Sequence, residues 1–138
     1  MTGFSFEEFD RRAAPPAHPS VTIQKRGTFG LNRAAHESLG SPTHVKLLFD
    51  PERRVIGITA ASAEDPNAYR LQKQQRARNY LLSGRAFANR YGIPLGQARR
   101  YRGEMHGDVL TVDLQQDAID ASWPPKERDE FGRIPPAE

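Results

Sequence analysis

The sequence predicts an α+β fold that is mainly β. We expect a small barrel built from two similar strand-strand-helix-strand-strand units, with disordered or loosely packed termini. Three observations predict it. Short runs of alternating apolar and polar side chains recur, and glycine or proline separates them. Two short helical segments each end in glycine, with proline two residues later. Finally, the order of elements in residues 20–60 is found again in residues 68–114.

The strands of the first unit form two expected hairpins. Residues 21–25 alternate apolar and polar side chains, and residues 28–31 return after a turn that contains Gly27. Residues 45–49 and 55–59 are apolar and rich in β-branched side chains, and a turn with proline at its second position joins them. This second pair is the clearest hairpin in the chain.

Each unit also has a short helix with a start and a stop signal. Asn32 can accept hydrogen bonds from the free amides of a first turn, and Gly40 can adopt the left-handed conformation that ends a helix. In the second unit Ser83 occupies the N-cap slot, residues 84–91 form the helix, and Gly92 repeats the stop. Both helices are about two turns long, so packing must hold them.

The second unit supplies the remaining strands. Residues 69–73 and 79–82 correspond to the first hairpin, with a longer polar loop between them. Residues 97–102 and 109–114 correspond to the second hairpin, and a turn is expected at residues 105–108. Identity between the two units is low, so an unrelated α+β domain with two similar helical turns is the alternative.

The expected organisation is a single domain with two polar extensions. Residues 1–19 are expected to form a flexible N-terminal arm, and residues 115–138 a polar tail that contains proline. The globular domain covers residues 20–114, with units at 20–60 and 68–114. An arm whose aromatic side chains dock on the barrel or on a partner is the alternative.

Composition limits the compartment. The chain has 138 residues and no cysteine, which excludes a disulfide framework or a thiolate zinc site and favours a reducing cytoplasm. The first ten residues carry acids and no basic region, so they do not resemble a signal peptide. No apolar run approaches the roughly 20 residues of a spanning helix. We therefore expect a cytoplasmic protein without a membrane partner.

Charge is segregated along the chain. Residues 20–114 hold fifteen basic and eight acidic side chains, whereas residues 1–19 and 115–138 are both net acidic. A basic middle between acidic ends suggests that the middle meets a polyanion.

The first unit resembles the AbrB/SpoVT type of DNA-binding module. The resemblance lies in residues 27–40 (GTFGLNRAAHESLG), 45–50 (VKLLFD) and 55–58 (VIGI). It implies a swapped-hairpin barrel made by two chains, with basic side chains placed on DNA. With a second unit in the same chain, the protein is also similar to double-psi and cradle-loop barrels, where one polypeptide supplies both halves. Those barrels serve enzymes and adaptors too, so fold alone does not give function.

The informative stretch for function is residues 70–102, which carries nine basic side chains and no acid. Eight of the nine are arginine, whose planar fork suits phosphate, and four interleaved aromatic side chains offer stacking on bases. The alternatives are a solvated basic surface whose aromatics form the core, and an acidic protein partner. Across both units the candidate nucleic-acid contacts are Lys25, Arg26, Arg33, Lys73, Arg76, Arg78, Arg85, Arg100 and Arg102.

The expected function is therefore nucleic-acid binding, with DNA favoured over RNA, by a small regulatory or accessory protein. A homodimer is a further expectation. The alternative is a non-enzymatic adaptor that engages a protein through the arm from Phe4 to Phe9 or through the tail at Trp123. No catalytic motif, cofactor loop or metal-spaced histidine pair is visible. An enzyme whose site is assembled from distant residues remains a weaker alternative.

Overall fold

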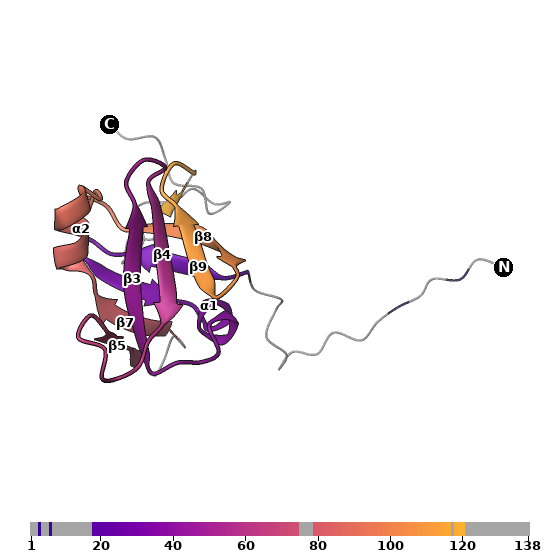
Figure 1. The fold of residues 1–138 in the computed structure, drawn as a ribbon. Coiled ribbons are helices and arrows are strands. Elements are labelled where there is room, and N and C mark those ends of the chain that lie inside the picture. Colours follow the sequence, from indigo (N-terminus) through magenta and orange to yellow (C-terminus); the bar gives the residue numbers. More distant parts are fainter. Residues whose placement is uncertain (1–2, 4–5, 7–17, 75–78, 117, 121–138) are drawn as a thin grey trace, which may run out of the picture.

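The computed structural model describes residues 3, 6, 18–74, 79–116 and 118–120. The predicted arm and most of the predicted tail lie outside these residues. The described chain is mainly β and forms a nearly closed antiparallel barrel with two short helices (Figure 1). Its elements are β1 (Ser20–Ile23), β2 (Thr28–Leu31), α1 (Arg33–Ser38), β3 (His44–Asp50), β4 (Val55–Ala60), β5 (Tyr69–Arg70), β6 (Gln72–Gln74), β7 (Asn79–Ser83), α2 (Arg85–Tyr91), β8 (Arg99–His106), β9 (Val109–Asp113) and β10 (Ile119–Asp120).

The sheet closes on itself because its two end strands are neighbours in the chain. The strand order is β5-β3-β4-β9-β8-β1-β2-β7-β6, and β10 adds to β8. Strands β5 and β6 flank Leu71, whose backbone N–H donates to the carbonyl of Thr43 at 2.9 Å. The sequence predicted one strand over residues 69–73, whereas the structure divides it between two partners, β3 and β7.

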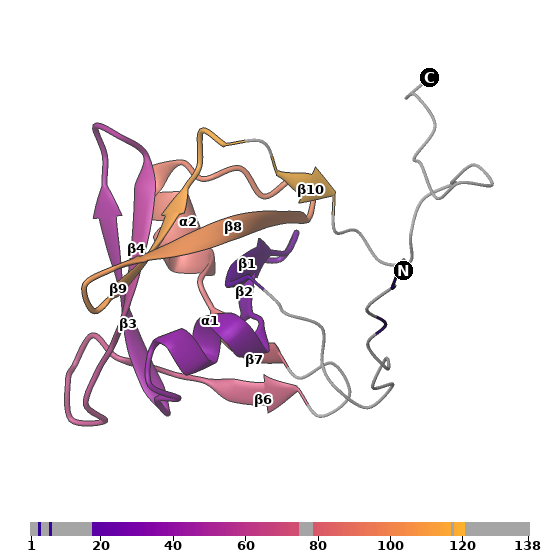
Figure 2. The same cartoon turned by 90° about the vertical axis from the view of Figure 1, so that its right-hand side faces the viewer.

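Strand β8 belongs to both sides of the barrel, as Figure 2 shows. Its first half pairs with β1 and its second half, from Gly103 to His106, pairs with β9. The sequence predicted a strand at residues 97–102 and a turn at 105–108. The strand instead runs from Arg99 to His106, and the turn is confined to residues 107 and 108. In the sequence, Gly103 indicates the end of a strand, because glycine weakens strand interiors. In the structure it is buried within β8, and a Cβ there would lie 2.9 Å from Cδ1 of Leu110. Glycine is required at this point by close strand packing.

The core lies inside the barrel and follows the alternation of the strands. Each fully buried side chain contributes roughly 1.5–3 kcal/mol through removal of apolar surface from water. The largest are Phe29, Ile23, Leu31, Ile56, Ile58, Leu110, Val21, Val45 and Val112. Because alternate residues point inward, the residues between them form the outer faces of the barrel.

Helix α1 begins as predicted. The Asn32 side chain accepts from the backbone N–H of Ala35 at 2.9 Å, and also from that of Ser20 at 3.0 Å. Gly40 follows the helix with a φ of 86°, a conformation that glycine adopts without strain. The Asn32 side chain therefore links the start of β1 to the start of α1.

Helix α2 begins differently from the prediction. Ser83 belongs to β7, the N-cap position is Gly84, and no side chain caps the helix. A Cβ at Gly84 would lie 2.8 Å from the ring of Phe29, so only glycine allows this approach. The end of α2 agrees with the prediction, because Gly92 is left-handed with a φ of 65°. Neither described helix is long and apolar enough to cross a bilayer.

Candidate binding surfaces

A basic cluster forms where the β1–β2 turn meets the start of α2. Lys25 and Arg26 are exposed in the turn. The carbonyl of the next residue, Gly27, accepts from the N–H of Gly84 at 2.9 Å, and a Cβ on Gly27 would lie 2.5 Å from Cβ of Arg85. Close contact between the turn and the helix thus brings Arg85 beside two cations that are far away in the sequence.

Strand β8 adds two more cations beside β1. Arg100 and Arg102 are exposed, and Tyr101 between them is buried with 3% exposure, as strand alternation predicted. Arg102 lies opposite Ser20 and Arg100 opposite Thr22, so the pair leads along β1 toward the turn. We call the set formed by Lys25, Arg26, Arg85, Arg100 and Arg102 the basic band.

The sheet surface next to the basic band combines small side chains with one leucine. Thr22 lies opposite Gly30, and Thr28 lies opposite Ser83. Leu81 of β7 also lies opposite Gly30, and a Cβ on Gly30 would be 3.2 Å from its Cδ2.

The basic band carries charge that the described residues do not pair. The ion pairs between described residues are Arg33–Glu37, Lys46–Asp65, Arg53–Asp50 and His106–Glu104. Arg102 contacts a ring nitrogen of His18 at 3.3 Å, which supplies no negative charge of its own. Asp120 of β10 is in register with Arg99, which precedes the band on β8.

The remaining predicted contacts fall elsewhere. Arg33 begins α1 and pairs with Glu37 at 2.7 Å, and this hydrogen-bonded carboxylate raises the pKa of the guanidinium. Lys73 is exposed on β6, opposite Tyr80. Arg76 and Arg78 lie outside the described residues. The structure therefore places five of the nine predicted cations in the basic band, whereas Arg33 is engaged in an ion pair on α1 and Lys73 lies on β6.

The aromatic side chains of residues 70–102 are not free to stack on bases, which corrects one expectation. Tyr101 and Phe87 are buried, with 3% and 8% exposure. The ring of Tyr80 stacks on His36 with centroids 3.6 Å apart, and Tyr91 stacks on Phe49 at 4.5 Å. Tyr80 and Tyr91 are half-buried and pack against the core, so all four rings are engaged within the molecule.

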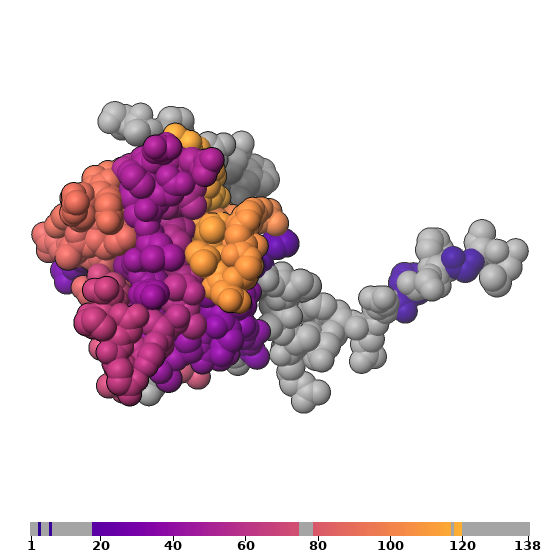
Figure 3. Space-filling view, in the orientation of Figure 1, coloured from indigo at the N-terminus to yellow at the C-terminus, as the bar shows by residue number. Residues whose placement is uncertain are grey.

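A second surface is a groove on the outer face of β3, β4, β9 and β8 (Figure 3). It is an open hollow of about 500 Å³. Gly57 lies on its floor, and a Cβ there would be 3.0 Å from Cγ1 of Val109 and 3.2 Å from Cβ of Leu48. Val55 also lines the hollow, and Leu48 is 43% exposed. The floor of the groove is thus apolar and reachable.

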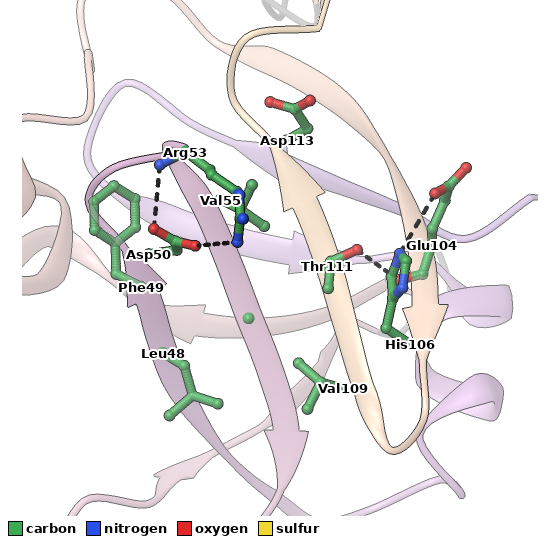
Figure 4. Close-up of a pocket in the computed structure, with 11 residues that line it drawn as sticks. Leu48, Phe49, Asp50, Arg53, Val55, Glu104, His106, Val109, Thr111 and Asp113 are labelled. Atoms are coloured by element: carbon green, nitrogen blue, oxygen red, sulfur yellow. Dashed lines mark hydrogen bonds and ion pairs between the residues drawn. The ribbon is translucent and has the colours of Figure 1, made fainter.

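The rim of the groove is charged, as Figure 4 shows. Asp50 and Arg53 form an ion pair at 3.5 Å, and Glu104 lies 3.7 Å from His106. Asp113 is exposed between these pairs and accepts a hydrogen bond from the N–H of Gln115. No pattern in the sequence predicted this groove, because four strands contribute to it. Its one local signal was a glycine in the middle of an apolar strand.

The described residues suggest no metal site, since no three histidine, aspartate or glutamate side chains come together within them. Of the arm from Phe4 to Phe9, the structure describes Phe6, which is 88% exposed. Trp123 lies outside the described residues.

Comparison of the chain with protein-family models, curated proteins and solved structures gives no match.

Proposed function

We propose that this is a small nucleic-acid-binding protein, regulatory or accessory in role and cytoplasmic, that holds DNA in preference to RNA. One observation carries the proposal: cations from three separate segments meet in the basic band, and no described carboxylate pairs with them. The resemblance of residues 27–58 to AbrB/SpoVT modules is what favours DNA.

Phosphate contacts are the interaction that this surface suits. Arginine offers a planar fork of donors for phosphate oxygens, and each neutralised phosphate releases counterions. Five such contacts predict a slope of about −4.5 in log K against log salt, which is roughly a 500-fold loss between 50 and 200 mM salt. The aromatic rings of this stretch are buried or stacked on neighbouring rings, so we expect backbone contacts to dominate and base preference to be weak.

The two-unit architecture belongs to the same proposal, and strand pairing supports it. Hairpins β1–β2 and β6–β7 have corresponding places, as have β3–β4 and β8–β9. Between the units, β1 of the first pairs with β8 of the second, and β5 of the second pairs in the same way with β3 of the first. The pairs β2–β7 and β4–β9 each join two strands that occupy the same place in their units. One chain then supplies both halves that the swapped-hairpin relatives take from two. A homodimer is therefore proposed as an association of complete barrels.

The test is a pair of matched charge reversals. Arg100→Glu with Arg102→Glu removes two contacts of the basic band. Arg70→Glu with Arg90→Glu makes the same change in net charge at exposed positions outside it. Fluorescence anisotropy with a labelled 24-base-pair duplex should show at least tenfold weaker binding for the first double variant. Its salt slope should be shallower by about 1.8.

Two results would contradict the proposal. Equal losses in both double variants would mean that net charge alone attracts the duplex. Failure of the unmodified protein to bind DNA or RNA below tens of micromolar at low salt would remove the function altogether.

A protein-interaction adaptor is the second candidate, and the groove is the observation that favours it. An apolar floor with an exposed leucine and a charged rim is typical of a surface that accepts a peptide. Leu48→Asp should abolish such an interaction and leave duplex binding unchanged, whereas the reversals in the basic band should do the opposite.

A further inference from the structure

Strand register determines which side chains meet across the groove. Gly57 of β4 lies opposite Leu48 of β3 and, on its other side, opposite Thr111 of β9. Thr111 in turn lies opposite Glu104 of β8. One row across this face therefore runs from an apolar side chain over a glycine and a threonine to a carboxylate. The glycine, which has no side chain, forms the lowest point of the row.

A second carboxylate lies on the same side of the groove as Glu104. Asp113 is two residues along β9 from Thr111, so both side chains are on the outer face of the strand. Glu104, Thr111 and Asp113 line the groove and also a smaller hollow of about 200 Å³ beside it. Arg102 and Gln116 complete this smaller hollow. The groove is thus apolar over β3 and β4 and acidic over β9 and β8 (Figure 4).

Neither of these two carboxylates pairs with a lysine or arginine among the described residues. Glu104 lies 3.7 Å from the ring of His106, which is positively charged only when it is protonated. Arg53 is at the same end of the groove as Asp113, but it pairs with Asp50 at 3.5 Å. The lining therefore holds three carboxylates against one arginine and one histidine. The groove is net negative in either state of the histidine, although the chain carries a net charge of +3.

We propose that the groove binds a peptide that carries an apolar side chain and, two residues away, a lysine or arginine. This inference rests on the adaptor candidate, for which it names the class of partner. The apolar side chain of the peptide lies above Gly57, against Leu48 and Val109. The cation lies between the carboxylates of Glu104 and Asp113.

The spacing of the strands supports this arrangement. Strand β9 is one position from β4 and β8 is two, which is about 5 Å and 10 Å at the usual distance between strands. Side chains two residues apart in an extended peptide are separated by about 7 Å. A cation at that distance from the apolar side chain falls between the two strands that carry the carboxylates.

The same charges argue against other occupants. A nucleic acid or an acidic peptide would bring like charge to the groove, which weakens binding. A second copy of this chain could bring only its basic band to meet the carboxylates. That occupant is an outcome of the experiment below.

The experiment titrates three peptides into the full chain labelled with nitrogen-15 and follows the amide chemical shifts. The probes are acetylated and amidated, with the sequences Arg-Ser-Leu-Ser-Arg, Gln-Ser-Leu-Ser-Gln and Glu-Ser-Leu-Ser-Glu. Arginine stands on both sides of the leucine so that either direction of the peptide presents a cation. The arginine peptide should shift the amides of Gly57, Thr111 and Asp113, with roughly fivefold higher affinity than the glutamine peptide. The glutamate peptide should bind most weakly.

Two double variants test the carboxylates themselves. Glu104→Gln with Asp113→Asn keeps the shape of both side chains and removes their charge. It should lower the affinity for the arginine peptide to that for the glutamine peptide and leave the latter unchanged. Glu37→Gln with Glu64→Gln makes the same change in net charge at exposed positions that do not line the groove. This control should keep the preference for arginine.

The outcomes separate this inference from the proposals on which it depends. Equal affinity for the arginine and glutamine peptides would overturn it and leave the groove as a peptide site without charge preference. Absence of groove shifts with every peptide would remove both the inference and the groove-based adaptor. Neither result bears on duplex binding, which fluorescence anisotropy tests separately.

Two further results would contradict the inference. Loss of the arginine preference in both double variants would mean that net charge alone attracts the peptide. Shifts of the groove amides on dilution of the protein without peptide would mean that a second copy occupies the groove.

Discussion

The two outer faces of the barrel differ in whether their charged side chains form ion pairs. In the basic band, Lys25, Arg26, Arg85 and Arg100 have no ion pair among the described residues. In the groove, Arg53 pairs with a carboxylate across the β3–β4 turn and His106 lies beside another. The first face retains positive charge for a partner. The second face pairs Arg53 with Asp50 at the rim and exposes an apolar floor.

One strand serves both faces, and the change occurs within it. Residues 99–102 of β8 pair with β1 and present arginines, whereas residues 103–106 pair with β9 and present Glu104 and His106. Gly103 stands at the boundary. A sheet that curls into a barrel can thus give one strand two chemical environments, because its ends face different directions.

The largest expected effect comes from breaking the core that both faces share. Phe29 is fully buried and packs edge-on against Phe87. Phe29→Ala should lower the free energy of unfolding by about 3–5 kcal/mol, through lost burial and the cavity left behind. Urea denaturation measures the loss, and Gln72→Ala on the exposed β6 is the control, expected within about 0.5 kcal/mol.

Hydrogen exchange shows whether the faces depend on each other. If the barrel has one core, Phe29→Ala lowers protection of the amides of β4 and β9 as much as those of β2. If the amides of β4 and β9 kept their protection while those of β2 lost it, the two faces would belong to independent folding units.

A smaller effect should separate the faces. Gly27 has a φ of 90°, and a Cβ there would meet the backbone of Arg85 at 2.6 Å. Gly27→Ala should cost about 1–3 kcal/mol in backbone strain, with crowding in addition, and should push the turn away from α2. Duplex binding, measured by fluorescence anisotropy, should weaken.

Gly40→Ala is the matched control for this change. Gly40 has a φ of 86°, but a Cβ added there would meet no atom within 4 Å. The variant should therefore suffer the strain without the crowding and keep its affinity for the duplex. Equal losses of affinity in both variants would show that the contact between turn and helix does not assemble the basic band.

Local signals account for the parts of the fold that the sequence predicted. The Asn32 cap, the left-handed Gly40 and Gly92, and the hairpin around Pro51 each depend on a few neighbouring residues. Ser83 failed as a cap because Phe29, far away in sequence, leaves room only for glycine at the next position. Strand β8 was predicted too short for a similar reason, since Gly103 is required by contact with β9.

The candidate surfaces also differ in how far local sequence patterns predicted them. Alternation within one strand was enough to predict that Arg100 and Arg102 share a face. The meeting of Lys25 and Arg26 with Arg85 depends on the pairing of β2 with β7, which no local pattern reveals. The groove is lined by residues of four strands, so no local sequence pattern could predict its lining.

Asn32 lies at the start of β1, beside the end of the basic band, and its replacement should have an intermediate effect. Its side chain accepts from Ala35 and Ser20 and donates to the carbonyl of His18. Asn32→Ala should cost about 1–2 kcal/mol, because it removes a helix cap and two further links. Asn32→Asp keeps the acceptor, so urea denaturation should show that it recovers most of the stability. Equal destabilisation by both variants would mean that the cap contributes little.

The smallest effect concerns an ion pair at the edge of the groove face. The N–H of Asn67 and then Lys46 hold the pKa of Asp65 below its ordinary value of 3.8. A carboxyl with a lowered folded-state pKa adds stability above its unfolded pKa, and this contribution is lost as the pH falls through the folded value. Asp65→Asn should therefore lower the urea midpoint slightly at pH 7, and the difference should disappear as the pH falls below 3.8 and through the lowered folded-state pKa of Asp65. High salt should shrink the difference at pH 7, because the pair is partly exposed. If the difference persists unchanged at low pH, Asp65 acts through the shape of its turn, and charge pairing on this face then matters less to stability than the contrast with the basic band implies.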